Sequence, residues 1–389
     1  MTFSRPSPFG TSLILAALLV LLLTQCGPSG GSEASGTANA PDRSGAAADG
    51  EIPLGIAPVH WDATRPAAKP GLVGPLHTIS LTSSSLELTR YFYEGGLRMT
   101  LDGPFPQPAS KLHRQRQFWD LPDSIRWQTY RLHRPETPDA IQIRLLLLQH
   151  ETPPVHQTPE ARELGPLLLG FTNRHQARLD DSLRAKGFAT LTGGTTRRLA
   201  SAEGGDYRFY ETVFRAPDFT LVAGIEGLDE PAALGPLDAQ TGMGGPSYAV
   251  HVVDSLARFT DFLTKVLDWE IRAEQSLTVA AGSAWGLPEG TVLNTALAYA
   301  KGASSGQLLL VDYADERTFP PHAPARLPHR GLGMWTFRTR DLGEVRRRAE
   351  AYGSPIVYGP VTYETPLVGM AKVMTLRAPD GFMIEMFEQ

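Results

Sequence analysis

Apolar residues recur along this chain with two spacings, and together these spacings predict short helices set among strands. Leu342, Val345, Ala349 and Tyr352 fall on one helical stripe. A second stripe of the same kind is formed by Leu256, Phe259, Leu263 and Val266. Apolar runs of strand length flank the first stripe, GMWTFRT before it and AKVMTLRAPD after it. The pattern therefore predicts a mixed α+β protein.

The predicted elements repeat in a fixed order. The tetrapeptide RAPD occurs at residues 215–218 and 377–380, each time between two apolar strands. Upstream of each copy a helical segment ends at Gly187 or Gly353, and glycine is the usual left-handed cap of a helix. Each unit thus reads as strand, helix and three strands. Four such βαβββ units are predicted, at about residues 75–151, 165–228, 246–315 and 330–389.

The first 26 residues read as a lipoprotein signal peptide. An apolar run, Leu13–Leu23, is too short to span a bilayer and has the length of a secretory core. The only cysteine, Cys26, follows directly in LTQC, which resembles a bacterial lipobox. Residues 27–74 are rich in small and polar residues and predict a flexible tether with an extended lead-in. We therefore expect an exported protein of the cell envelope, anchored to a bacterial membrane by a lipid on Cys26.

Charge and cysteine content exclude several classes of function. The chain has 36 Lys and Arg against 41 Asp and Glu, a net charge of -5. No basic cluster interleaves with aromatic residues, so we expect no nucleic-acid partner. A single cysteine permits neither an internal disulfide nor a zinc site built on several thiolates.

Pairs of βαβββ units that end in a strand of the form APDG-x-x-IE resemble the vicinal oxygen chelate superfamily. The last strand here, in APDGFMIEMFEQ, threads one carboxylate, Glu385, through an apolar run. The superfamily includes glyoxalase I, extradiol dioxygenases, methylmalonyl-CoA epimerase and the fosfomycin and bleomycin resistance proteins. The resemblance covers residues 75–389 and implies two half-open mixed-sheet barrels, each around a small-molecule cavity.

The resemblance also implies a divalent metal, bound by histidines of first strands and glutamates of last strands. Two of eight such positions hold a ligand type, namely His77 in the first unit and Glu385 in the fourth. The other six are apolar or aromatic: Leu147, Leu167 or Leu168, Ala223, Tyr248, Leu310 and Met334. His251 lies three residues beyond a ligand position and is expected to point to the opposite face. The residues expected to line a pocket are Tyr248, Met334, Trp335 and Phe337.

Two pairings of the units are open. Sequential elements tend to be spatial neighbours, so we expect a first domain of units one and two, at 75–228, and a second of units three and four, at 246–389. That pairing separates His77 from Glu385. Pairing unit one with unit four instead brings both into one barrel, where an imidazole or a shared cation relieves the cost of burying the carboxylate.

Three functions fit the sequence. The first is a metal-dependent lyase, isomerase or dioxygenase with a degenerate ligand set, using a divalent metal ion as cofactor. The second is a metal-free protein that binds or sequesters a small organic molecule, as the bleomycin resistance proteins do. The third is a non-catalytic scaffold at the membrane surface. Metal content separates the first from the others, and an apolar cavity lined by aromatic residues favours the second over the third.

The lipid anchor gives the first testable prediction. Cys26→Ser removes the only residue to which the lipid can be attached, so the protein should leave the membrane fraction of its native host. Fractionation followed by immunoblotting measures this. A variant that stays in the membrane fraction contradicts the lipoprotein interpretation.

Overall fold

The computed structural model describes residues 69–156, 163–200, 206–228, 235–279, 287–303, 305–314 and 324–389. Cys26, the signal peptide and nearly all of the expected tether lie outside these residues. Among the described helices, none is both long enough and apolar enough to cross a membrane.

The described residues form the four expected units of one helix and four strands, and the first unit carries one additional helix. In unit one these are β1 (Val73–Ser83), α2 (Leu86–Tyr93), β2 (Thr100–Asp102), α3 (Ala109–Phe118), β3 (Trp127–His133) and β4 (Gln142–Leu148). In unit two they are β5 (Gly165–Asn173), α4 (Gln176–Ala185), β6 (Thr190–Ala200), β7 (Asp206–Arg215), the 3-10 turn η1 (Pro217–Phe219) and β8 (Leu221–Gly227). In unit three they are β9 (Met243–Val253), α5 (Leu256–Lys265), β10 (Trp269–Thr278), β11 (Val292–Ala300) and β12 (Gln307–Tyr313). In unit four they are β13 (Gly331–Thr339), α6 (Leu342–Tyr352), β14 (Ile356–Thr365), β15 (Gly369–Arg377) and β16 (Met383–Glu388).

Local signals explain the ends of the helices. The Asp341 side chain caps the start of α6 by accepting a hydrogen bond from the backbone N–H of Glu344 at 2.9 Å. At the other end of α6, Gly353 adopts the left-handed conformation, with φ of 87°. A residue with a side chain is strained there, which is why a glycine stops the helix.

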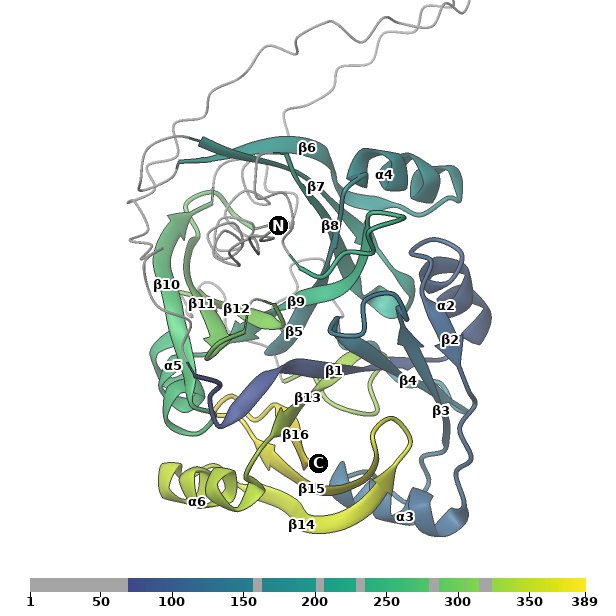
Figure 1. Cartoon of the computed structure of the whole chain (residues 1–389), viewed down its shortest axis with the longest axis vertical. Helices are drawn as coiled ribbons and strands as arrows, with labels where there is room; N and C mark the ends of the chain where they lie inside the picture. The colour runs from purple at the N-terminus through teal and green to yellow at the C-terminus, as the bar shows by residue number, and fades with distance from the viewer. Residues whose placement is uncertain are drawn as a thin grey trace, which may run out of the picture.

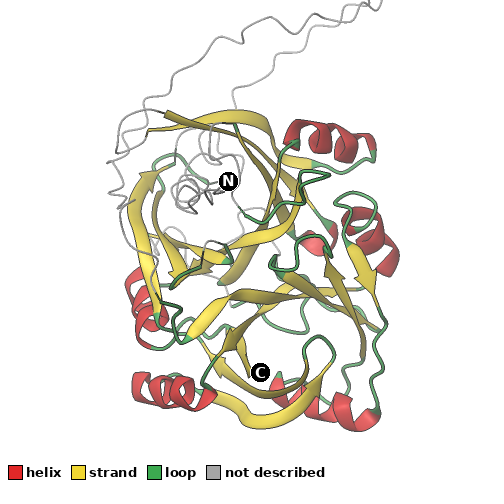
Figure 2. Ribbon diagram, in the orientation of Figure 1, coloured by secondary structure: helices red, strands yellow, loops and turns green. Residues whose placement is uncertain are grey.

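The strands form two eight-stranded mixed sheets, each curled into a half-open barrel (Figure 1). One sheet has the order β14-β15-β16-β13-β1-β4-β3-β2 and joins the first unit to the last; we call it the terminal barrel. The other has the order β10-β11-β12-β9-β5-β8-β7-β6 and joins the two middle units; we call it the central barrel. Most of the helices lie on the outer sides of the sheets (Figure 2).

The expected grouping of unit one with unit two and unit three with unit four is thus wrong. Strand β1 pairs with β13, antiparallel, and β5 pairs with β9 in the same way. A physical reason lies in the buried charges. Arg144 of unit one and Glu385 of unit four are 4% and 5% exposed. In separate barrels each charge would be buried alone, which costs several kcal/mol, roughly 3–5, when one partner of a pair is missing.

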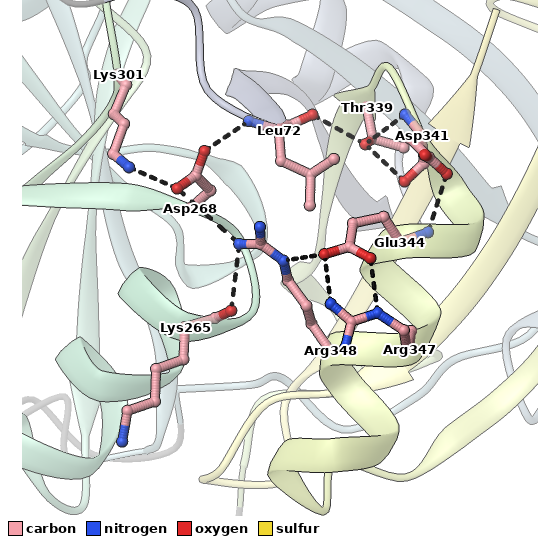
Figure 3. Close-up of polar contacts among 9 residues, drawn as sticks. All are labelled: Leu72, Lys265, Asp268, Lys301, Thr339, Asp341, Glu344, Arg347 and Arg348. Carbon is pink, nitrogen blue, oxygen red and sulfur yellow. Dashed lines mark hydrogen bonds and ion pairs between the residues drawn. The ribbon is translucent and has the colours of Figure 1, made fainter.

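The two barrels pack against each other through the largest apolar cluster, which contains residues of both sheets, such as Phe171, Ala249, Trp335 and Phe337. A polar network reinforces this contact (Figure 3). Asp268, which follows α5, accepts hydrogen bonds from the backbone N–H of Leu72 at 3.0 Å and from Lys301 at 2.5 Å. Arg348 of α6 reaches the same carboxylate at 3.9 Å and pairs with Glu344 at 2.7 Å. The start of β1 is thereby tied to both barrels.

We predict that Asp268→Asn lowers the free energy of unfolding by about 1 kcal/mol, because it removes the charge that holds Lys301 and Arg348. Asparagine tolerates the positive φ of 61° at this position, so backbone strain does not add to the effect. Asp261→Asn is the matched control. Its partner Lys265 is 66% exposed, so the loss should stay below about 0.5 kcal/mol. Urea unfolding measures both, and equal losses would contradict a special role for Asp268.

Candidate functional site

The register of the terminal barrel identifies two equivalent positions in its first and last units. Strands β1 and β13 are related by a local two-fold axis at the pair Ile79 and Trp335. One residue further along each strand are Ser80 and Thr336. Arg144 of β4 lies beside Ser80, and Glu385 of β16 lies beside Thr336.

Arg144 therefore occupies in unit one the last-strand position that Glu385 occupies in unit four. The assignment of Leu147 to this position is corrected. A run of four leucines, at 145–148, carries no sign of which residue faces which neighbour, and only the strand register supplies it.

Glu385 is buried but fully engaged. Its Oε1 accepts hydrogen bonds from Arg144 Nη2 at 2.5 Å and from the Thr336 hydroxyl at 3.2 Å. Its Oε2 accepts a hydrogen bond from Trp119 Nε1 at 2.9 Å. One cation and two neutral donors thus replace the water that the carboxylate loses on burial.

Arg144 is held at one end of its guanidinium. Besides the contact with Glu385, its Cζ lies 5.3 Å from the centre of the Trp119 ring, a cation–π arrangement. Nε and Nη1 are buried and have no hydrogen-bond partner in the described part of the chain. The ion pair is therefore end-on rather than bidentate, and two nitrogens retain donor capacity.

Helix α3 delivers Trp119 and closes the terminal barrel. The helix follows β2, one edge of the sheet, and lies beside β14, the other edge (Figure 1). The Phe118 carbonyl accepts a hydrogen bond from the Thr375 hydroxyl at 2.7 Å, and the Phe118 ring packs on Tyr358 at 4.8 Å. Side chains of this segment thus fill part of the barrel's concave side.

His77 shares the terminal barrel with Glu385 but does not pair with it. It is the extra residue of a β-bulge between Leu76 and Thr78. Nδ1 lies 2.7 Å from the Thr78 hydroxyl, and the ring packs edge-on against Phe387 with centroids 5.0 Å apart. Burial lowers the pKa of His77 to about 4, and the positive charge of Arg144 lowers it further than the charge of Glu385 raises it. The imidazole is therefore neutral near pH 7.

The expected metal site does not fit the terminal barrel. The oxygen that a cation would bind, Glu385 Oε1, is occupied by a guanidinium. No group of three or more His, Cys, Asp or Glu side chains comes together anywhere in the described part of the chain. His77 and Glu385 thus lie in one barrel without forming a ligand set, since a divalent ion needs several converging donors.

The four ligand positions of the central barrel hold neither a carboxylate nor an imidazole. The two-fold axis there passes through the pair Leu169 and Ala249. First-strand positions hold Leu168 and Tyr248, and last-strand positions hold Ala223 and Leu309. Leu309 replaces the expected Leu310, which lies on the opposite face of β12 and belongs to the cluster between the barrels. Apart from a tyrosine, these side chains have no donor atom.

The residues expected to line one pocket divide among three places. Tyr248 faces the interior of the central barrel, and Met334 faces that of the terminal barrel. Trp335 and Phe337 point the other way, into the cluster between the barrels. The expectation for Trp335 and Phe337 is thus corrected. Successive side chains of a strand alternate between faces, so residues 334 and 335 cannot both face one interior.

His251 lies on the face opposite the ligand position, as the sequence predicts, and connects the barrels. Its Nδ1 accepts a hydrogen bond from Trp335 Nε1 at 2.9 Å. Nε2 therefore carries the proton and donates to Asp380 Oδ2, also at 2.9 Å. Both the His251 and the Asp380 side chains are 0% exposed, so this arrangement is part of the core.

The inner face of the central barrel combines apolar residues with unpaired polar groups. Tyr248 lies so close over Gly170 that a Cβ on this glycine would be 1.6 Å from the ring. The Tyr248 hydroxyl is buried and has no hydrogen-bond partner among the residues that the structure describes. Gln307 is beside Tyr248 in the register, and neither its amide oxygen nor its nitrogen is hydrogen-bonded. Burial, and then the negative charge of Glu211, raises the pKa of Tyr248 well above its usual value.

Comparisons with known proteins agree with this architecture. Residues 245–386 match the family described as the Glyoxalase/Bleomycin resistance protein/Dioxygenase superfamily. The chain has the glyoxalase fold. The match spans units three and four, which lie in different barrels. None of the curated proteins matches the sequence significantly.

Several solved structures share the fold at low sequence identity. A glyoxalase I variant from Zea mays superposes with a TM-score of 0.53 at 14% identity, covering 81% of this chain and 92% of that chain. Glyoxalase I from Zea mays gives 0.50 at 14% identity, with the same two coverages of 81% and 92%. A candidate dioxygenase from Bacillus subtilis gives 0.50 at 12% identity, covering 82% and 86%. At such identities the likeness concerns the fold alone.

The lowered pKa of His77 predicts a pH dependence of stability. The folded state binds a proton below about pH 4 and the unfolded chain below about pH 6.5, so this contribution is complete above pH 6.5 and is lost as the pH falls toward 4. Between about pH 7 and pH 5 the loss should be roughly 2 kcal/mol.

His77→Gln keeps a polar side chain of similar reach and removes the titration. Urea unfolding at both pH values should show a drop in stability that is smaller by about the same amount in the variant. Identical drops in both proteins would mean that His77 is protonated as easily in the folded protein as in the unfolded chain.

Proposed function

We propose that this protein binds a small organic molecule without a metal, and that the ligand lies inside the central barrel. The observation that carries this proposal is the pair Tyr248 and Gln307. The two residues are neighbours in the strand register, and their polar atoms are buried without a hydrogen-bond partner among the described residues. A buried polar group left unpaired costs about 1–3 kcal/mol, and a ligand that pairs with both relieves this cost.

The surrounding side chains indicate the class of ligand. The inner face of the central barrel is dominated by leucine and valine, for example Leu168, Val250, Leu297 and Val311. Binding sites for small molecules typically combine such an apolar lining with a few convergent polar groups. We therefore expect a mostly apolar molecule with one hydroxyl, carbonyl or amide group.

The terminal barrel is the less suitable of the two barrels for the ligand. Its carboxylate is satisfied by three donors of the protein, and α3 lies across the opening between its edge strands. A metal-dependent lyase, isomerase or dioxygenase is not proposed, because the described residues of the two barrels bring together no group of three or more His, Cys, Asp or Glu side chains, on which such chemistry depends.

We also propose that binding takes place at a bacterial membrane surface, with Cys26 carrying the lipid. The support is the apolar run that directly precedes the only cysteine.

Tyr248→Phe provides a test in which stability and binding move in opposite directions. Removing an unpaired buried hydroxyl should stabilise the free protein by about 1 kcal/mol. Affinity for the ligand should fall roughly tenfold, because one hydrogen bond to it is lost. Native mass spectrometry of protein from the native host detects the bound molecule. Titration of the extracted molecule into protein freed of this ligand measures its affinity.

Tyr363→Phe is the matched control. Tyr363 also carries a buried hydroxyl without a partner, but it lies in the terminal barrel. This variant should gain stability in the same way and keep its affinity for the ligand. Equal affinities of the Tyr248→Phe variant and the unmodified protein, or one equivalent of a divalent metal in the purified protein by elemental analysis, would overturn the proposal.

A further inference from the structure

We infer that the guanidinium of Arg144 holds the place, in the terminal barrel, that a divalent cation holds in metal-bearing proteins of this fold. Arg144 and Glu385 are equivalent last-strand residues of the two units that build the barrel. The resemblance implies a metal-binding glutamate at such positions. Here one of the two is a glutamate and the other is a cation bound to it.

The contacts of Arg144 fit this role better than that of an ordinary salt bridge. A single nitrogen, Nη2, approaches Glu385 Oε1, and the Thr336 hydroxyl contacts the same oxygen. Structural Arg–carboxylate pairs are frequently bidentate, with two parallel hydrogen bonds. Here one end of the delocalised cation lies against the oxygen atoms of Glu385 and Thr336, and Nε and Nη1 have no hydrogen-bond partner among the described residues.

Charge balance explains why the protein excludes a metal. Glu385 and Arg144 neutralise each other, and His77 is neutral near pH 7 because burial lowers its pKa to about 4. A divalent cation would add two positive charges to a neutral, buried cluster and would have to displace the guanidinium. Like charges this close in a buried site repel strongly.

The same charge balance predicts the effect of removing the arginine. Arg144→Ala leaves Glu385 as a buried carboxylate without a counter-ion, in a barrel that also contains the neutral imidazole of His77. Carboxylate and imidazole are donors for Ni²⁺, Co²⁺ and Zn²⁺. These cations should bind the variant and stabilise it, and they should not bind the unmodified protein.

Thermal unfolding with and without each of the three cations tests the inference. The Arg144→Ala variant should unfold at a lower Tm than the unmodified protein, and a cation at 100 times its Kd should raise that Tm by about 5 °C. The unmodified protein should show no such increase. Arg144→Ala combined with Glu385→Gln should show none either, because the carboxylate that binds the cation is gone.

Arg134→Ala is the matched control. Arg134 is also 4% exposed, but it donates to the backbone carbonyl of Leu97 at 3.0 Å rather than to a carboxylate. Its loss should lower the Tm without any response to cations. A similar response in this variant would show that the cations act elsewhere and would overturn the inference.

If the Arg144→Ala variant does not fold without a metal, a refolding experiment tests the inference instead. Recovery of soluble protein with Zn²⁺ but not with EDTA supports the inference, and equal recovery in both overturns it. An unchanged Tm of the Arg144→Ala variant with all three cations overturns it as well. These variants change no residue of the central barrel. The test of the proposed ligand binding there is therefore independent of the outcome of this experiment.

Discussion

The antiparallel pairing of β1 with β13 is the contact on which the rest of this structure depends. It joins the first unit of the chain to the last and encloses the two middle units between them in sequence. Closing so long a loop costs entropy, but the cost rises only logarithmically with length. In return, two residues of opposite charge, Arg144 and Glu385, meet inside one barrel. The pairing of the units and the charges of their interiors therefore support each other.

The two barrels share a fold but differ in the polar groups on their inner faces. In the terminal barrel an arginine, a tryptophan and a threonine surround the carboxylate of Glu385, and α3 covers them. In the central barrel the Tyr248 hydroxyl and the Gln307 amide have no hydrogen-bond partner among the described residues, on a mostly apolar inner face. Buried polar groups in proteins nearly always have partners. On this difference rests the proposal that a ligand lies in the central barrel and not in the terminal one.

The family match and the three-dimensional arrangement divide the chain differently. The matched residues, 245–386, are contiguous, yet each of their two units completes its barrel with a partner outside the matched range. Strand β9 pairs with β5, and β13 pairs with β1. A fragment restricted to this range would expose two sheet edges and two unfilled concave faces. The smallest part that forms both complete half-open barrels is therefore the whole described chain, from β1 to β16.

The sequence alone determined the repeating unit, because glycine caps, apolar stripes and the RAPD turn are local signals that act within a few residues. It also identified Glu385 as an unusual carboxylate and placed His251 on the face away from the ligand positions. It could not identify Arg144, and it favoured the wrong pairing of units. Both depend on strand register, and a shift of one residue moves every side chain to the other face without changing composition or periodicity. Only the tertiary structure sets this register, since the energy that selects it comes from contacts between distant units, such as that of Arg144 with Glu385, which are 241 residues apart.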